Sequence, residues 1–220
     1  MNAIIRLTDA KEALVRAAEK LIAERGLDAV SDREIARAAG QKNNSAVQYH
    51  FGDRAGLINA ILDFRMIPLN QKRHEMLDEL LNRKEPPTTR DLVKVLLLPY
   101  MENLKTSRED SSYTSLVSQL FQRGNQQILA MDPPRSSSLV RMTEAFATTL
   151  PHLSVKERHA RLTFMGSMVV HTVARWDQQC RLDPETWTPE HIVQQTRFLI
   201  EFLAGGMDQD ALQREPESRS

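Results

Sequence analysis

A run of uncharged polar side chains between Asn43 and Tyr49 is the part of the sequence best suited to recognising another molecule. The segment reads N-N-S-A-V-Q-Y, and its amide and hydroxyl groups donate and accept hydrogen bonds without carrying charge. Asparagine and glutamine amides bind adenine edges in the major groove of DNA, and serine bonds to several bases. Tyrosine hydroxyls and helix N-termini suit phosphate oxygens, which position a protein but carry no sequence code. The segment therefore predicts a short helix that reads DNA.

Two short helices joined by a glycine-containing turn are expected to position this segment. Ser31 and Glu34 have the spacing of a capping box, so the first helix should begin there. It should stop at Gly40, because glycine enters the left-handed conformation at little cost. The second helix should begin at Asn43 or Asn44, since both are good caps. This pair is typical of a helix-turn-helix, although a small surface hairpin of helices remains the alternative.

Residues on both sides of this segment match a known family pattern. They are Ala17, Ala18, Gly26, Ile35, Ala36, Ala39, Gly40, Tyr49, His50, Phe51, Gly52 and Leu57. Residues 14–62, about a quarter of the chain, resemble the DNA-binding domain of the tetracycline-repressor (TetR) family of bacterial regulators. One departure is the polar pair Gln41 and Lys42 after the turn glycine, where the family usually has a small apolar residue. Residues 40–51 are also one residue longer than usual, so we expect the turn to bulge.

An all-α fold in two domains is expected for the chain. Its 8 glycines and scarce β-branched alternation argue against sheet, and 220 residues are enough for a sizeable core. The resemblance implies about nine helices. A three-helix DNA-binding head should occupy residues 1–53, and a helical domain for effector binding and dimerisation should occupy residues 54–207. Residues 208–220 should form a disordered tail.

Several signals predict where the later helices begin and end. Pro68 cannot continue a regular hydrogen-bond ladder, so it should kink or break the helix that begins at Arg54. Residues 131–138, M-D-P-P-R-S-S-S, should form a turn or a flexible loop. The last helix should end at Gly205 and Gly206. Helix-starting signals stand at Thr8 or Asp9, at Asp53, at Ser154 and at Thr188.

The candidate DNA contacts surround the second short helix. Arg54 is included because a cation in the first turn of a helix opposes the helix dipole, so a neighbouring phosphate would explain it. The candidates are Ser31, Arg33, Lys42, Asn43, Asn44, Ser45, Ala46, Gln48, Tyr49, His50 and Arg54.

The charge balance is weak for a protein that binds nucleic acid. The chain holds 29 basic and 29 acidic residues, and residues 1–55 hold nine basic and eight acidic ones. DNA-binding domains are often markedly basic. The cations should therefore be segregated towards DNA, and nonspecific binding should be modest. The cations expected to face DNA are Arg6, Lys11, Arg33, Arg37, Lys42 and Arg54.

Membrane and secretory signals are not found in the sequence. It has no run of about 18 apolar residues, and its N-terminus lacks the apolar core of a secretory signal. Cys180 is the single cysteine, so an intrachain disulfide is excluded and a buried structural thiol is expected. These features fit a protein of the reducing bacterial cytoplasm.

Enzymatic and metal chemistry are also disfavoured. The sequence has no Gly-rich phosphate loop, H-E-x-x-H or G-x-S-x-G motif. His152 and His159, the closest pair of histidines, would lie about 10 Å apart along a helix, too far to share a zinc ion. We therefore expect no enzyme activity, no cofactor and no metal site.

The resemblance implies an effector cavity in the second domain, where a small molecule binds and moves the heads. Plain hydrophobic core is the alternative for each apolar candidate. His171, alone on an apolar helix, is more often a satisfied core residue than a ligand group. Without concentrated charge in this region, we expect an uncharged or weakly polar effector. The candidates are Phe64, Leu97, Tyr100, Met101, Leu104, Leu120, Phe121, Phe146, Met165, Met168 and His171.

A homodimer is expected because one short helix reads too few base pairs, whereas two heads about 34–36 Å apart match a pseudo-palindrome. In the resembled family the last two helices pair across the two-fold axis as a four-helix bundle. Intrachain core is the alternative for the residues concerned. The candidates are Gly166, Val169, Val173, Trp176, Phe198, Leu199, Phe202 and Leu203.

The sequence therefore predicts a homodimeric transcriptional regulator, a repressor that a small-molecule effector releases from a double-stranded DNA operator. Two other hypotheses stay open. One is a DNA-binding dimer that responds to no effector. The other is a small-molecule-binding protein or enzyme whose head is vestigial, which the near-neutral charge and the altered turn would explain.

Overall fold

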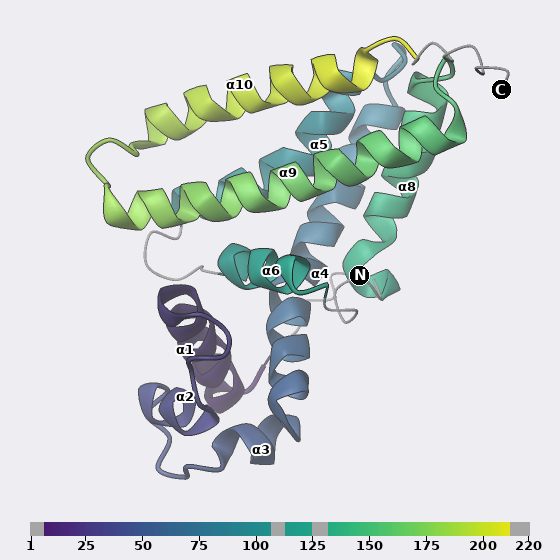
Figure 1. Ribbon diagram of the computed structural model, residues 1–220. Helices are drawn as coiled ribbons and strands as arrows, with labels where there is room; N and C mark the ends of the chain where they lie inside the picture. The colour runs from purple at the N-terminus through teal and green to yellow at the C-terminus, as the bar shows by residue number, and fades with distance from the viewer. Residues whose placement is uncertain (1–6, 107–112, 125–131, 212–220) are drawn as a thin grey trace, which may run out of the picture.

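The computed structural model describes residues 7–106, 113–124 and 132–211, and within these ranges the chain is all-α, as predicted. A small head of three helices lies at one end, and α4 leads from it into a larger helical bundle (Figure 1). The expected DNA-facing Arg6 and residues 212–220 of the expected tail lie outside the described ranges. The described helices are α1 (Asp9–Arg25), α2 (Asp32–Ala38), α3 (Ala46–Phe51), α4 (Arg54–Leu81), α5 (Thr89–Thr106), α6 (Tyr113–Gln122), α8 (Pro133–Thr149), α9 (Val155–Leu182) and α10 (Pro189–Asp208).

Most predicted helix starts are confirmed by side chains that cap them. Ser31 and Glu34 form a complete capping box at α2, and Ser154 and Glu157 form a second one at α9. The side chain of Thr188 accepts a hydrogen bond from the His191 N–H at the start of α10. Each such cap contributes about 1 kcal/mol to the stability of its helix.

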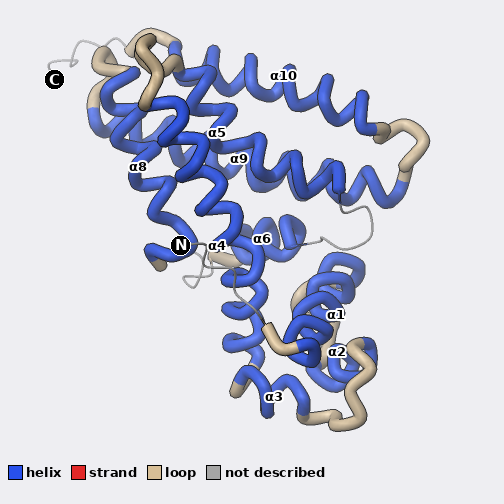
Figure 2. The backbone as a smooth tube through the Cα atoms, turned by 180° about the vertical axis from the view of Figure 1, so that it is seen from behind, coloured by secondary structure: helices blue, strands red, loops and turns tan. Residues whose placement is uncertain are grey.

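Pro68 does not break α4, which continues through it because its long contact with α8 outweighs the one ladder hydrogen bond that proline removes (Figure 2). Two other predicted boundaries are wrong. α8 begins at Pro133, inside the segment expected to be a loop, since a proline in the first turn lacks only an N–H that would have no partner there. α10 passes through Gly205 and Gly206 to Asp208, and the buried Met207 holds its last turn.

Two apolar cores hold the described part of the molecule together. One lies among α4, α5, α8, α9 and α10, and Leu97 and Phe146 are fully buried within it. The other joins the three head helices to the first half of α4 and to α6. Leu116 and Leu120 of α6 are fully buried in this head-side core together with Leu57 of α4. Helix α6 is therefore packed directly onto the head.

A polar seam joins α4 to α8 inside the larger bundle. The guanidinium of the buried Arg135 donates from Nε to Asp63 Oδ1 at 2.5 Å. The side chain of the buried Asn70 accepts from the Ser138 N–H at 2.8 Å. Because buried polar groups are costly to leave unpaired, these complementary pairs fix the register between the two helices.

We expect the seam to weaken in acid because of His74. Arg141 can only donate, so its 2.8 Å contact with Nδ1 requires a neutral His74 whose Nε2–H donates to Ser137 at 2.8 Å. Burial, followed by the charge of Arg141, lowers the pKa of His74 below its ordinary 6.5. The unfolded chain therefore takes up the proton first as the pH falls below about 6.5, and the free energy of unfolding should fall with it. His74→Gln, which keeps the hydrogen-bonding capacity, should flatten that dependence in urea titrations. An unchanged slope would contradict this assignment.

Candidate nucleic-acid interface and ligand cavity

Residues 39–45 connect α2 to α3, and neither asparagine caps α3. Gly40 has a φ of +69°, the left-handed conformation expected where α2 stops. Asn43 Oδ1 then accepts from the Ser45 N–H at 2.9 Å, and its carbonyl accepts from the Ala46 N–H at 3.1 Å. This local Asx turn uses the asparagine before the helix begins, so the N-cap of α3 is Ser45, one or two residues later than expected, and the helix runs from Ala46.

One face of α3 and the turn before it is exposed and polar. Gln48 lies on this face, and the side chain of Tyr49 is 79% exposed. His50 is half-buried and packs edge-on against Tyr49, with ring centroids 4.9 Å apart. Ala46 is an exception among the predicted contacts, since it is buried with Val47 in the head core and cannot reach DNA. We call the exposed set the reading face; it consists of Lys42, Asn43, Asn44, Ser45, Gln48 and Tyr49.

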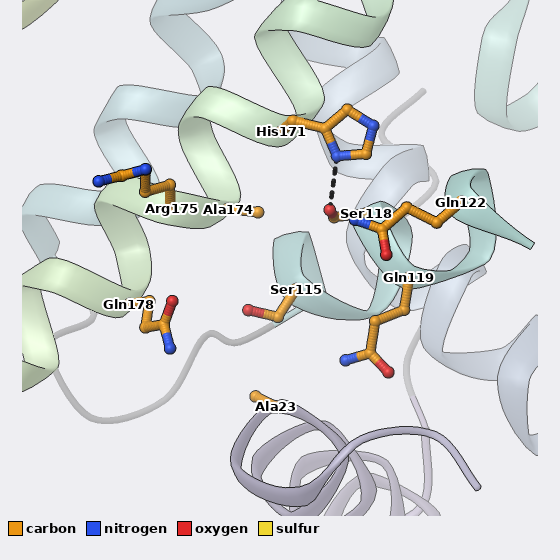
Figure 3. Close-up of a pocket in the computed structure, with 9 residues that line it drawn as sticks. All are labelled: Ala23, Ser115, Ser118, Gln119, Gln122, His171, Ala174, Arg175 and Gln178. Carbon is orange, nitrogen blue, oxygen red and sulfur yellow. Dashed lines mark hydrogen bonds between the residues drawn. The ribbon is translucent and has the colours of Figure 1, made fainter.

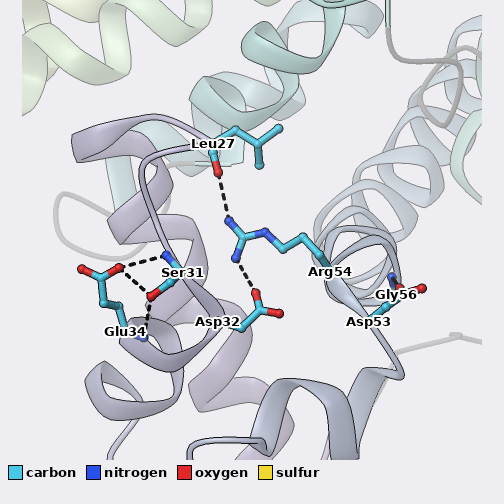
Figure 4. Close-up of polar contacts among 7 residues, drawn as sticks. All are labelled: Leu27, Ser31, Asp32, Glu34, Asp53, Arg54 and Gly56. Carbon is cyan, nitrogen blue, oxygen red and sulfur yellow. Dashed lines mark hydrogen bonds and ion pairs between the residues drawn. The ribbon is translucent and has the colours of Figure 1, made fainter.

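The predicted contacts on α2 are also exposed, but one already has an intramolecular role. The Ser31 hydroxyl donates to Glu34 at 2.7 Å and accepts from the Glu34 N–H at 3.3 Å (Figure 4). Hydrogen bonds from Ser31, followed by the Arg25 guanidinium, hold the pKa of Glu34 at about 2. Ser31 thus serves the helix cap, while Arg33 and Arg37 are exposed cations of the head.

Arg54 has a different environment from the expected one. Its guanidinium turns inward, donating to Asp32 Oδ1 at 2.9 Å and to the Leu27 carbonyl at 3.1 Å (Figure 4). Asp32 in the first turn of α2 therefore neutralises the cation that we expected a phosphate to neutralise. Gly56, in the first turn of α4, was not predicted as important, yet a Cβ there would lie 2.0 Å from the carbonyl oxygen of Phe51. Only glycine fits where α3 meets α4.

Arg54→Ala should therefore lower stability more than it alters the salt dependence of DNA binding. The substitution removes a partly exposed ion pair and a charged hydrogen bond, and we expect the free energy of unfolding to fall by about 1–2 kcal/mol. Lys42→Ala, which removes an exposed cation, is the matched control. It should leave stability unchanged and reduce the salt slope of the affinity by about one for each phosphate that is no longer neutralised. Thermal unfolding and DNA titrations at several salt concentrations measure both effects. A reduced salt slope of the affinity for Arg54→Ala would contradict this assignment and support the original prediction that Arg54 binds a phosphate.

A cavity of about 420 Å³ lies in the larger domain among α4, α5, α6, α8 and α9. Tyr100, Phe121, Phe146 and Met165 line it, as predicted. Other predicted lining residues lie elsewhere, because the inward faces of these helices are shared between the cavity and solid core. Leu97, Met101, Leu104 and Leu120 are core, Phe64 packs at the head, and Met168 is exposed.

Arg73 of α4 is a cavity-lining residue that was not predicted. It is 1% exposed, and it interrupts an apolar stripe between Leu69 and Leu77. That position, one cation on the buried face of a helix, was a signal visible in the sequence. Its Nη2 donates to the Leu96 carbonyl at 3.1 Å, and its guanidinium lies 4.9 Å from the centre of the Tyr100 ring. Burying an ion costs several kcal/mol, whereas a desolvated cation–π contact contributes about 2 kcal/mol, so the charge is only partly compensated.

His171 faces a second, more open and polar hollow between α1, α6 and α9 (Figure 3). Its Nδ1 lies 2.7 Å from the Ser118 hydroxyl, which agrees with the interpretation of a satisfied histidine. In the same hollow, Gln119 accepts from the Leu27 N–H at 2.8 Å and donates to the Ile22 carbonyl at 3.3 Å. Gln119 thereby attaches α6 to the end of α1.

The predicted dimer residues divide into buried and exposed sets. Gly166 and Val169 line the cavity. Val173, Trp176, Leu199 and Leu203 are buried within a single chain, in the apolar core that α9 and α10 share with α4, α5 and α8. Phe198 and Phe202, spaced by one turn of α10, are 59% and 65% exposed. Phe164 and Met168 on the neighbouring α9 are exposed too. We call these four residues the α9–α10 apolar face: Phe164, Met168, Phe198 and Phe202.

Two other kinds of site are missing from the described part of the chain. No group of three or more histidine, cysteine, aspartate or glutamate side chains there could hold a metal ion. None of the helices in these ranges is long and apolar enough to cross a membrane. Cys180 is buried and forms no disulfide, as predicted.

Comparison with solved structures shows that this fold is known. NalD from Pseudomonas aeruginosa, described as the secondary repressor of the MexAB-OprM multidrug efflux pump, is 22% identical, with a TM-score of 0.56 over 90% of this chain and 96% of that one. Mycobacterium smegmatis BioQ is 16% identical, with a TM-score of 0.52 over 92% and 98% of the two chains. A TetR-family transcriptional regulator from Rhodococcus sp. is also 16% identical, with a TM-score of 0.52 over 90% and 100%. No curated protein matches the chain.

Family models match the chain in both domains. Residues 14–61 match the model described as bacterial regulatory proteins of the tetR family. Residues 94–206, just over half of the chain, match the C-terminal domain described as tetracyclin repressor-like. The chain therefore belongs to the TetR family and is a DNA-binding transcriptional regulator, not an enzyme.

Proposed function

We propose that the chain is a homodimeric repressor whose two heads bind a pseudo-palindromic operator, and that a small-molecule effector releases it. The observation that carries this proposal is the reading face on α3. Lys42 supplies one exposed cation for the phosphates, and the amide of Gln48 suits a base edge. The buried Ala46 and Val47 anchor the opposite side of α3 in the head. A rigid support of this kind lets a side chain reach the same base in every complex.

The α9–α10 apolar face supports the dimer. Isolated apolar side chains on a surface are ordinary, but Phe198 and Phe202 lie one helical turn apart, and Phe164 and Met168 are exposed on α9, which packs against α10. Burying them against a second copy would remove a large aromatic area from water. A dimer formed through this face would carry two heads, as an operator with two half-sites about one helical turn apart requires.

Helix α6 supports a link between the cavity and the head. Val117 and Phe121 line the cavity, while Gln119 binds the end of α1 and Leu116 packs in the head core. A ligand that displaces α6 would thus alter the seat of the head, in addition to any movement passed along α4. A coupling free energy of about 1–3 kcal/mol between the two sites would suffice for a regulator.

Selection of genomic DNA fragments by the purified full-length chain tests this function. We expect enriched fragments to share two half-sites related by two-fold symmetry and separated by one helical turn or a multiple of it. A metabolite that raises the melting temperature should also release the protein from those fragments. Ligand binding without specific DNA binding would favour a vestigial head. Specific DNA binding that no ligand alters would favour the effector-independent dimer.

A further inference from the structure

We propose that the effector is an apolar molecule with one carboxylate, which Arg73 binds at the buried end of the cavity. This inference rests on the proposed function, since it names the chemical class of the molecule that the cavity would take. It departs from the uncharged effector that the sequence led us to expect, because Arg73 places a positive charge on the cavity wall.

The first observation behind this inference is that the buried charge of Arg73 has no carboxylate partner among the described residues. Its side chain is almost completely buried, and it forms no ion pair with any described residue. A buried cation is normally paired, because water no longer solvates it. Two other arginines that are largely buried follow that rule: Arg135 binds Asp63, and Arg65 binds Glu19 with two hydrogen bonds. Among these three, Arg73 alone faces the cavity without a carboxylate.

The second observation is that hydrogen-bond donors at and near Arg73 have no acceptor among the described residues. Nη2 of Arg73 is occupied by the Leu96 carbonyl and the guanidinium face by Tyr100, but Nε–H has no acceptor among the described residues. The hydroxyl of Tyr113 also lacks a partner there, and its ring stacks on Tyr100 with centroids 6.4 Å apart. Burial raises the pKa of Tyr113 well above its ordinary value of 10.0, so this hydroxyl stays a neutral donor. A carboxylate in the cavity would accept from the Nε–H of Arg73 and neutralise its guanidinium, whereas Tyr113 is not one of the residues that line the cavity.

The remaining cavity wall determines the chemical character of the ligand beyond its carboxylate. Most of it is apolar, with the methionine and phenylalanine side chains of α8 and α9 opposite α6. Three of the polar lining residues, Thr143, His159 and Thr163, are exposed, so the opening lies between α8 and α9, away from the buried Arg73. An amphipathic acid would therefore enter with its carboxylate first and leave its apolar body against Phe121 and Phe146.

If Arg73 had a purely structural role, an acid and its amide would bind equally well, so matched pairs of ligands distinguish that role from carboxylate binding. The probes are octanoate and 4-phenylbutyrate, each paired with its primary amide, which keeps the shape but lacks the charge. Isothermal titration and thermal unfolding are measured on the full-length parent, Arg73→Met, and Arg175→Met. Arg175 is an exposed cation of the other hollow and serves as the control. We expect the parent and Arg175→Met to bind at least one acid about ten- to a hundredfold more tightly than its amide.

Arg73→Met should abolish that preference without lowering the melting temperature, because it replaces a partly compensated buried cation with an apolar side chain of similar length. Amides that bind as tightly as the acids, acid binding that persists in Arg73→Met, or the absence of binding by either acid would overturn the inference. Should Arg73→Met fail to fold, the comparison of acid with amide on the parent still decides the question. If only neutral molecules released the protein from its operator, the proposed repressor function would stand and the inference of a carboxylate effector would be wrong.

Discussion

Replacing Gln48 by alanine is expected to weaken operator binding by roughly five- to 150-fold for each half-site, and to relax base preference at one position. Gln48 lies on the exposed side of α3, directly after the buried Val47 that anchors the helix. An amide that pairs bidentately with a base contributes about 1–3 kcal/mol of discrimination. Titrations against operators that carry each of the four bases at the contacted position measure both effects.

The matched control for this prediction is Lys42→Ala, on the same reading face. Removing a cation that binds phosphate should weaken binding to all sequences alike and reduce the salt slope, whereas removing Gln48 should change base preference and leave the slope unaltered. Tyr49 gives a second comparison, because its hydroxyl is also expected to bind the DNA backbone. If Gln48→Ala bound every operator variant like the parent, the reading face would be placed on the wrong side of α3.

Phe198→Glu combined with Phe202→Glu should dissociate the dimer. Both side chains are exposed in the single chain, so the substitutions leave its core intact. In a two-fold interface each new carboxylate would be buried without a partner beside its own symmetry copy. An uncompensated buried charge costs about 3–5 kcal/mol, so the dissociation constant of the dimer should rise by about a thousandfold or more. Sedimentation velocity over a range of concentrations measures this change.

Val140→Glu is the control, since Val140 of α8 is 59% exposed, the same fraction as Phe198, but lies outside the α9–α10 apolar face. It should leave the chain dimeric. Operator affinity should fall in the double variant at concentrations where the chain is monomeric, because a single head reads only one half-site. A double variant that stays dimeric would move the interface to another surface.

The head was predictable in most of its detail because short-range chemistry decides its helices. The Ser31–Glu34 box and the Asp53 cap each act over three residues, so their positions in the sequence suffice to place the helix starts. The start of α3 was predicted wrongly because short-range chemistry allowed two different structures there. Asn43 had two local uses, a cap or an Asx turn, and the turn formed because Ala46 and Val47 had to reach the head core.

The larger domain was less predictable because its helices are apolar over much of their surface. Periodicity identified α9 and α10 as helices, but it could not distinguish the side that packs within one chain from the side left exposed. Val173 and Leu199 proved to be intrachain core, while Phe198 and Phe202 remained exposed. Periodicity also could not separate cavity wall from solid core, since both need apolar residues on inward faces.

The amino-acid sequence by itself determined the all-α class, the helix caps, the helix-turn-helix and the family. Each of these depends on residues within a few positions of one another or on a linear pattern that matches known relatives. The tertiary structure alone decided that Arg54 pairs with Asp32, that α6 joins the head to the cavity wall, and that Arg73 faces the cavity. Those features depend on contacts between helices far apart in the chain, and the free energies of packing and of buried charge select them only once all the helices are in place.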